Sequence, residues 1–234
     1  MSDAIAAERP FPYIQVDIAD HVSGLRPDRL YRGAWGVNPG LLDAVADDRL
    51  KIDMRSERHL TPEELALDHT RIVRIPVQQD GVVPTLHDNA GRADYTQNYI
   101  GLLDSCGPAL GEVTRLAAAS VGTGPVVIGC SLGRDRTGVL IGLLLAGLGY
   151  EFDQVLAAER SMRAEVAAQV QRCPYEFEGM TRAAVLQRLG AAHESILDIL
   201  LHCQRHWGSA RGYLRLHGVD DECWTGLAAA LLVT

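Results

Sequence analysis

Lysine is almost absent from this sequence, because Lys51 is the only one among 22 basic residues. The 30 acidic residues give a formal net charge of −8, which argues against general attraction to nucleic acid or to an anionic membrane surface. A local basic pocket is still compatible with this balance. The scarcity of lysine beside abundant arginine and alanine favours a bacterial source with a GC-rich genome.

The sequence also lacks the signals of a secreted or membrane-spanning protein. Its five cysteines are an odd number without paired or metal-ligand spacing, which favours a reducing compartment. The first fifteen residues have no basic segment followed by an apolar run, so we expect no signal peptide. The apolar run over residues 139–148 is far shorter than the roughly 20 residues that a membrane-spanning helix needs. We therefore expect a cytoplasmic protein without stable membrane insertion.

The hydrophobic pattern predicts an α/β fold. Residues 1–24 are expected to form an N-terminal arm and residues 25–234 a single domain. A small central sheet flanked by helices, with a helical C-terminal half, is expected from the order of the predicted elements. The expected strands are 30–31, 50–54, 71–77 and 126–128. Residues 95–119 are expected to form one or two helices, broken near Gly107-Pro108, and further helices are expected over 139–148, 152–168, 181–189, 193–206 and 220–232.

One segment, PVVIGCSLGRDRTGVLIGLLLAGLG (125–149), places a thiol and several charges between two apolar runs. The first run predicts a strand that ends at Cys130, and the second predicts a helix. A strand that enters a helix through a glycine-containing loop forms an anion site, because backbone N–H groups point inward and the helix N-terminus adds positive charge. Gly133 and Gly138 allow a tight turn and close approach to a ligand.

The side chains of this loop favour the same interpretation. Arg136 offers a planar fork that can hold two phosphate oxygens at once. Cys130 faces the same cavity, where a helix N-terminus and an arginine favour the nucleophilic thiolate. The Thr137 hydroxyl is placed to donate a hydrogen bond to the sulfur. An isolated cysteine is more often an inert core thiol, but the segment SLGRDRTG that follows argues against that alternative.

The string CSLGRDRTG resembles the signature of the cysteine-dependent protein tyrosine phosphatases. It is closest to the motif HCxAGKDRTG of a bacterial branch with tyrosine, dual-specificity and phosphoinositide phosphatase activities. LYRGAW (30–35) is similar to the YRS segment of that branch, and IDMRSER (52–58) is similar to its DLRSxxE strand and turn. HWGSARGYLRLHGVDDE (206–222) is similar to its C-terminal YGSxxxYLxxxxGxSDE. The resemblance therefore covers most of the chain and implies a tyrosine-phosphatase-like fold.

The resemblance implies a phosphomonoester hydrolase that needs neither a metal ion nor a cofactor. In that chemistry the Cys130 thiolate attacks phosphorus in line and forms a cysteinyl-phosphate, which water then cleaves. Arg136 and the backbone N–H groups of residues 131–136 hold the three equatorial oxygens. A phosphoprotein, a phosphoinositide and a small phosphorylated metabolite all fit as substrates. The residues expected to line the substrate site are Ser131, Leu132, Gly133, Arg134, Thr137 and Gly138.

Three carboxylates are candidates for the general acid that protonates the leaving oxygen. The resemblance points equally to Asp53, in the DLRS-like strand, and to Asp135, inside the loop. Asp80, in the QQDG segment, ranks third by analogy with the acid-bearing loop of other tyrosine phosphatases. Asp53 also has a structural interpretation, as the partner of an arginine such as Arg32 or Arg55.

Three residues depart from the motif of that branch. Gly129 stands where a histidine usually orients the loop and supports the thiolate, so a catalytically weak or inactive phosphate-binding pseudophosphatase is the alternative function. Arg134 replaces a lysine and would place an extra cation at the rim, and Leu132 replaces an alanine. Sulfur or redox chemistry at Cys130 ranks last, because no second cysteine lies near it in sequence.

The helices after residue 150 are expected to act as packing elements. In the resembled family this region can form a lid over the site. On these helices Asp153 and Glu159 are expected at solvated positions.

Overall fold

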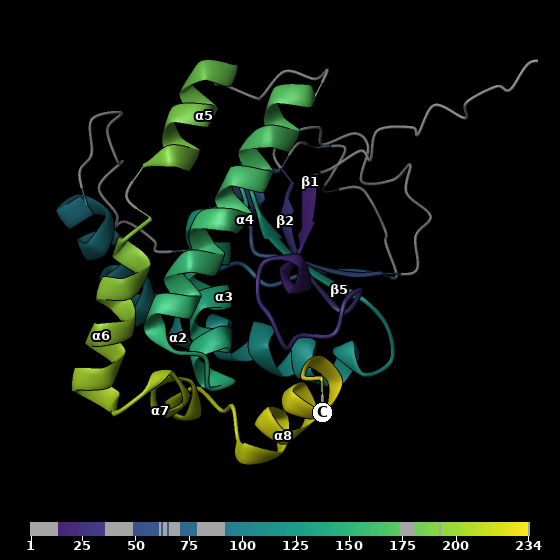
Figure 1. The fold of residues 1–234 in the computed structure, drawn as a ribbon, viewed down its shortest axis with the longest axis vertical. Helices are drawn as coiled ribbons and strands as arrows, with labels where there is room; N and C mark the ends of the chain where they lie inside the picture. Colours follow the sequence, from purple (N-terminus) through teal and green to yellow (C-terminus); the bar gives the residue numbers. More distant parts are fainter. Residues whose placement is uncertain are drawn as a thin grey trace, which may run out of the picture.

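The computed structural model describes residues 14–35, 49–60, 62, 65, 71–78, 92–173, 181–191 and 193–233. This part of the chain contains a five-stranded sheet in the order β1-β2-β5-β3-β4 (Figure 1). β1 pairs antiparallel with β2, and the other neighbours are parallel. The strands are β1 (Ile14–Asp17), β2 (Leu30–Ala34), β3 (Leu50–Asp53), β4 (Ile72–Arg74) and β5 (Val126–Cys130).

Seven α-helices accompany the sheet in the described residues. They are α2 (Arg92–Val121), α3 (Asp135–Gly147), α4 (Phe152–Arg172), α5 (Arg182–Gly190), α6 (Ser195–Trp207), α7 (Ala210–Leu216) and α8 (Asp221–Leu231). α3 and α4 lie beside the sheet, and α6, α7 and α8 follow one another around the outside of α2 and α3 (Figure 1). The predicted α/β class with a small sheet and a helical C-terminal half is confirmed. None of these helices combines the length and apolar character needed to span a membrane.

The first strand lies within the segment that we expected to be an arm. Ile14–Asp17 pair with β2, with Ile14 opposite Ala34, and the side chains of Ile14 and Val16 are buried. The described part of residues 1–24 is therefore joined to the sheet, and residues 1–13 lie outside the described residues. The division of the chain into an arm and one domain stays a prediction.

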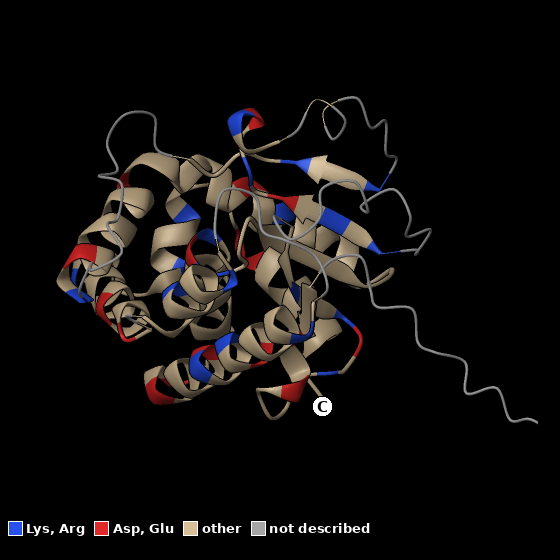
Figure 2. Cartoon of the chain, turned by 90° about the horizontal axis from the view of Figure 1, so that it is seen from above, with Lys and Arg blue, Asp and Glu red and all other residues tan. Residues whose placement is uncertain are grey.

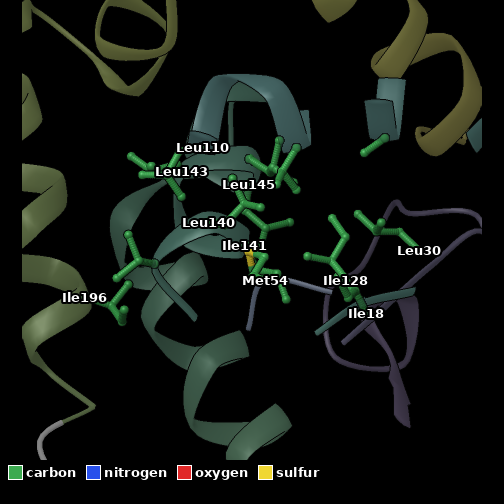
Figure 3. Close-up of a cluster of buried hydrophobic side chains, with 14 of the residues drawn as sticks. Ile18, Leu30, Met54, Leu110, Ile128, Leu140, Ile141, Leu143, Leu145 and Ile196 are labelled. Carbon is green, nitrogen blue, oxygen red and sulfur yellow. The ribbon is translucent and has the colours of Figure 1, made fainter. Parts of the chain in front are cut away.

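The core joins the sheet to the helices, and α3 contributes buried residues along most of its length. β5 occupies the centre of the sheet, and its residues Val126, Val127 and Ile128 are fully buried. A parallel strand that is covered on both faces is expected to be apolar throughout, as this one is. Ile128, Met54, which follows β3, and Ile141 of α3 all belong to the same cluster of buried hydrophobic side chains (Figure 3). This packing fixes β5 and α3, the two elements that hold the ends of the loop at residues 131–134.

The break expected near Gly107-Pro108 is wrong, because α2 is one helix with Pro108 inside it. Proline removes a backbone donor and normally kinks or ends a helix. Here Gly107 and Gly111 let His217 approach, since a Cβ atom on either glycine would lie 2.2 Å from an atom of that residue. Tyr213 Oη also donates a hydrogen bond of 2.7 Å to the Leu103 carbonyl. Packing against the C-terminal helices therefore outweighs the local helix-breaking signal.

Candidate active site

Cys130 ends β5, and its thiol lies at the start of α3. Its side chain is buried, and its sulfur accepts a hydrogen bond of 3.1 Å from Thr137 Oγ1. Thr137 belongs to the first turn of α3 and is also fully buried. The sulfur thus lies where the Thr137 hydroxyl and the N-terminus of α3 meet. The hydrogen bond expected from the sequence is therefore present.

Arg136 links the loop to the sheet. Its Nη1 donates to the Met54 carbonyl at 3.2 Å, and its Nη2 donates to Ser131 Oγ at 3.3 Å. These contacts hold the guanidinium beside the loop that begins at Ser131. Leu132, the next loop residue, is partly buried against the core. Arg136, in the first turn of α3, therefore places a fixed cation close to the polar atoms of the loop.

Close packing explains why glycine stands at positions 133 and 138. Gly133 has φ +61°, and a Cβ atom there would lie 2.6 Å from the Gly33 carbonyl oxygen of β2. A residue with a side chain would therefore be strained at this position and would also push the loop off the sheet. A Cβ atom on Gly138 would lie 2.9 Å from Glu159 Oε1. Gly138 thus makes room for a buried carboxylate of α4.

Asp135 is the first residue of α3, and its side chain is about one-third exposed. Its Oδ1 accepts a hydrogen bond of 2.7 Å from Tyr99 Oη and lies 3.5 Å from Arg134 Nε. Burial raises the pKa of Asp135, but the Arg134 charge and the Tyr99 hydrogen bond outweigh it and lower the pKa. Burial and the nearby Asp135 charge raise the pKa of Tyr99 well above its usual value. Tyr99 therefore stays protonated and keeps donating to this carboxylate.

Asp53 has a different environment, in which its carboxylate pairs with Arg55. The Asp53 Oδ2 lies 2.9 Å from Arg55 Nη2, and both side chains are buried. The Arg55 Nε and backbone N–H also donate to Asp53 Oδ1, at 3.1 and 2.9 Å. This geometry matches the structural interpretation of Asp53 with Arg55 as its partner. Asp80, the third candidate acid, lies outside the described residues.

Arg134 does not lie at an open rim, because its side chain is only 2% exposed. Its guanidinium stacks over the Tyr95 ring of α2, 4.2 Å from the ring centroid. Its Nη2 donates to the carbonyl of Ala191, just after α5, at 3.4 Å. In this arrangement Arg134 joins the loop to α2 and to the end of α5.

Two functional features were missed from the sequence alone. Glu159 is not solvated as expected, because it is 2% exposed and lies between the guanidinium groups of Arg32 and Arg163. Arg32 therefore pairs with Glu159 of α4 and not with Asp53. Tyr99 lies outside the signature segment, yet it supplies the hydrogen bond to Asp135. The positions of Glu159 and Arg163 inside the apolar stripe of residues 155–166 were the available signal for a buried ion pair.

Gly129 stands where the resembled motif has histidine, and Trp35 occupies the adjoining space. A Cβ atom on residue 129 would lie 2.0 Å from Trp35 Nε1. The Trp35 side chain is buried, and its backbone N–H donates to the Cys130 carbonyl at 2.9 Å. A histidine at position 129 is thus incompatible with the indole in this position.

Basic side chains outnumber acidic side chains around the loop. Figure 2 shows basic and acidic residues dispersed over the described elements. Beside the loop, Arg32, Arg134, Arg136 and Arg163 lie near two carboxylates, those of Asp135 and Glu159. The immediate surroundings of the loop are therefore net positive in a chain that is net negative.

The family assignment agrees with this geometry. A family model described as the tyrosine phosphatase family matches residues 23–233. A search of curated proteins finds no match. The family match spans nearly the whole chain, including the loop, the strand that carries Cys130 and all seven described helices. The chain therefore belongs to the tyrosine phosphatase family and is a protein tyrosine phosphatase-like enzyme that acts on a phosphorylated substrate.

Proposed function

We propose that the protein hydrolyses phosphomonoesters without a metal ion, through a cysteinyl-phosphate formed on Cys130. The observation that carries this proposal is the hydrogen bond of 3.1 Å from Thr137 Oγ1 to Cys130 Sγ, where β5 meets the N-terminus of α3. It favours an ionised sulfur next to backbone donors that can bind phosphate oxygens.

In the first step the Cys130 sulfur attacks phosphorus, and an S–P bond forms while the bond to the leaving oxygen breaks. A carboxylic acid delivers its proton to that oxygen. In the second step a water oxygen attacks phosphorus, and the same carboxylate accepts a proton from the water. The S–P bond then breaks, inorganic phosphate leaves, and the thiolate is restored.

The transferring group needs donors for its three equatorial oxygens. We assign this role to the Arg136 guanidinium and to the backbone N–H groups of residues 131–136. Arg136 is anchored on the Met54 carbonyl and on Ser131 Oγ, so little reorganisation precedes the reaction. The N-terminus of α3 adds partial positive charge on the same side.

We assign the acid role to Asp135 in preference to Asp53. The carboxylate of Asp53 is buried and already accepts several bonds from Arg55, which leaves it little capacity to serve a leaving oxygen. Asp135 is partly exposed beside the loop. Its pKa is lowered by Arg134 and Tyr99 in the absence of substrate. A phosphate dianion bound beside this carboxylate raises its pKa through like-charge repulsion, so substrate binding favours the protonated acid.

The test is a hydrolysis assay with aryl, alkyl, phosphopeptide and inositol phosphates, because all proposed substrate classes share the phosphomonoester. We expect release of inorganic phosphate that resists chelators and disappears in Cys130→Ser. Rapid acid quenching followed by intact-mass measurement should show one added phosphoryl group on the wild type and none on Cys130→Ser. Turnover that survives Cys130→Ser would contradict the mechanism. Vanadate binding without turnover of any substrate would favour the pseudophosphatase alternative.

A further inference from the structure

Arg32, on β2, contacts the loop from the side of the sheet and is completely buried. Its Nε donates to the Gly133 carbonyl at 2.5 Å, and its Nη2 donates to the Arg134 carbonyl at 3.2 Å. Its Nη1 lies 2.6 Å from Glu159 Oε2, and its Nη2 lies 3.3 Å from Oε1. One planar guanidinium therefore joins two successive loop carbonyls to one carboxylate of α4.

We propose that Arg32 is a positioning residue that aims the backbone N–H groups of residues 134 and 135 at the substrate phosphate. In a planar trans peptide the C=O and N–H groups point in opposite directions. Holding the carbonyls of Gly133 and Arg134 toward Arg32 therefore turns the N–H groups of the next residues away from it. At Arg134 the first turn of α3 assists, because this carbonyl also accepts a hydrogen bond of 2.8 Å from the Gly138 N–H. On this proposal, the side opposite Arg32 is the one that faces the substrate phosphate.

We call the contacts of Arg32 with the two loop carbonyls the clamp. Glu159 keeps this clamp in place. It accepts hydrogen bonds from Arg32 and also from Arg163, whose Nε lies 2.5 Å from Glu159 Oε1. Burial raises the pKa of Glu159, but the charges of Arg32 and Arg163 outweigh it and lower the pKa, so the carboxylate stays ionised. Gly138 of the signature segment lets this carboxylate lie against the first turn of α3.

The clamp depends on the shape of arginine as well as on its charge. A guanidinium presents five N–H donors in a rigid fork, whereas an ammonium is a point charge on a flexible stem. Lysine at position 32 could keep the charge near Glu159. It could not hold both loop carbonyls and the carboxylate in this geometry at the same time.

Arg163 provides a matched control. It is buried, it binds the same carboxylate, and its Nη1 donates at 2.9 Å to the Ala191 carbonyl, which the Arg134 side chain also contacts. It donates to neither of the two loop carbonyls that Arg32 holds. Arg163→Lys therefore perturbs the same ion pair without releasing the loop. Both variants should lose thermal stability to a similar extent, because both loosen a buried charge network.

The experiment compares wild type, Arg32→Lys and Arg163→Lys in three measurements: kcat and KM for an aryl phosphate, inhibition by vanadate, and amide hydrogen exchange of residues 131–138. Arg32→Lys should weaken vanadate inhibition and lower kcat/KM by about tenfold or more, as loss of a group that orients a ligand-binding group usually does. Its loop amides should also exchange faster. Arg163→Lys should change vanadate inhibition and loop exchange much less than Arg32→Lys does.

Equal losses of vanadate inhibition in the two variants would overturn the positioning role, and so would unchanged inhibition in Arg32→Lys. If Arg32→Lys does not fold, Glu159→Gln replaces it. This variant loosens the grip on Arg32 and should also weaken vanadate inhibition and speed loop exchange, and wild-type values would refute the proposal. The kinetic arm rests on the proposed function. A wild type that binds vanadate but does not turn over would contradict that function, while the binding and exchange arms would still test Arg32.

Discussion

The hydrogen bond from Thr137 to Cys130 allows a quantitative test of thiolate stabilisation. Thr137→Val removes one hydroxyl and nearly preserves the shape of a fully buried side chain. A hydrogen bond to a charged group contributes about 1.5–3 kcal/mol. Loss of the bond should therefore lower the ratio of thiolate to thiol at a given pH by about 10- to 100-fold, since each 1.4 kcal/mol corresponds to a factor of ten.

The direction of the effect follows from the sign of the charge. The hydroxyl donates to the sulfur, so it favours the ionised form. Removing the hydroxyl should therefore make the thiol ionise at a higher pH than in the wild type. The assay is the rate of alkylation by iodoacetamide between pH 4 and 10, with Cys130→Ser giving the background from the other cysteines. In Thr137→Val the rate at low pH should fall, and the profile should move to higher pH. The plateau rate should change little.

A matched control separates ionisation from folding. Thr114 is also fully buried, and its hydroxyl donates to the Leu110 carbonyl within α2 at 2.8 Å. Thr114→Val should leave the alkylation profile of Cys130 unchanged. If Thr137→Val gave the wild-type profile, or if both variants shifted it equally, the hydrogen bond would not be what stabilises the thiolate.

Three further predictions concern the loop and its surroundings. Arg136→Ala should lower kcat/KM by about 100-fold or more, whereas Arg134→Ala should mainly lower the melting temperature; equal losses of activity would contradict these roles. Asp135→Asn should slow hydrolysis of alkyl phosphates by about 100-fold or more and affect aryl phosphates less, because only poor leaving groups need the proton; equal slowing would argue against an acid role. Gly129→His should destabilise the fold by about 1–3 kcal/mol through overpacking against Trp35, and in a double-mutant cycle followed by urea unfolding the same substitution should cost less in a Trp35→Ala background than in the wild type.

The sequence predicted the elements whose patterns are local and strong. The apolar run before Cys130 and the one after it gave β5 and α3, which fix the position of the loop. β1 was missed because four residues at a sheet edge carry a weak alternating signal, and only pairing with β2 stabilises them. The proline inside α2 was misjudged because the C-terminal helices that hold that helix together lie more than a hundred residues away.

The sequence predicted the residues of the signature segment but not the buried ion pair that supports the loop. Cys130, Arg136 and Thr137 are close in sequence, so the single turn from β5 into α3 brings their side chains together. The ion pair of Arg32 and Glu159 joins residues 127 positions apart, which local spacing cannot reveal. Charged residues at buried positions of an amphipathic helix are nevertheless a usable signal, because such charges are almost always paired.

The pairing of Gly129 with Trp35 bears on whether the enzyme is active. From the motif alone, loss of the histidine suggests decay of the site and leaves a non-catalytic phosphate-binding protein as the alternative. In the fold, β2 and β5 pair with Gly33 opposite Gly129 and Ala34 opposite Cys130, so Trp35 directly follows the residue beside the thiol. Its indole fills the space over Gly129, and its backbone N–H holds the Cys130 carbonyl. The glycine is thus explained by packing against a large neighbour, and its presence is no longer an argument that the site has lost its chemistry.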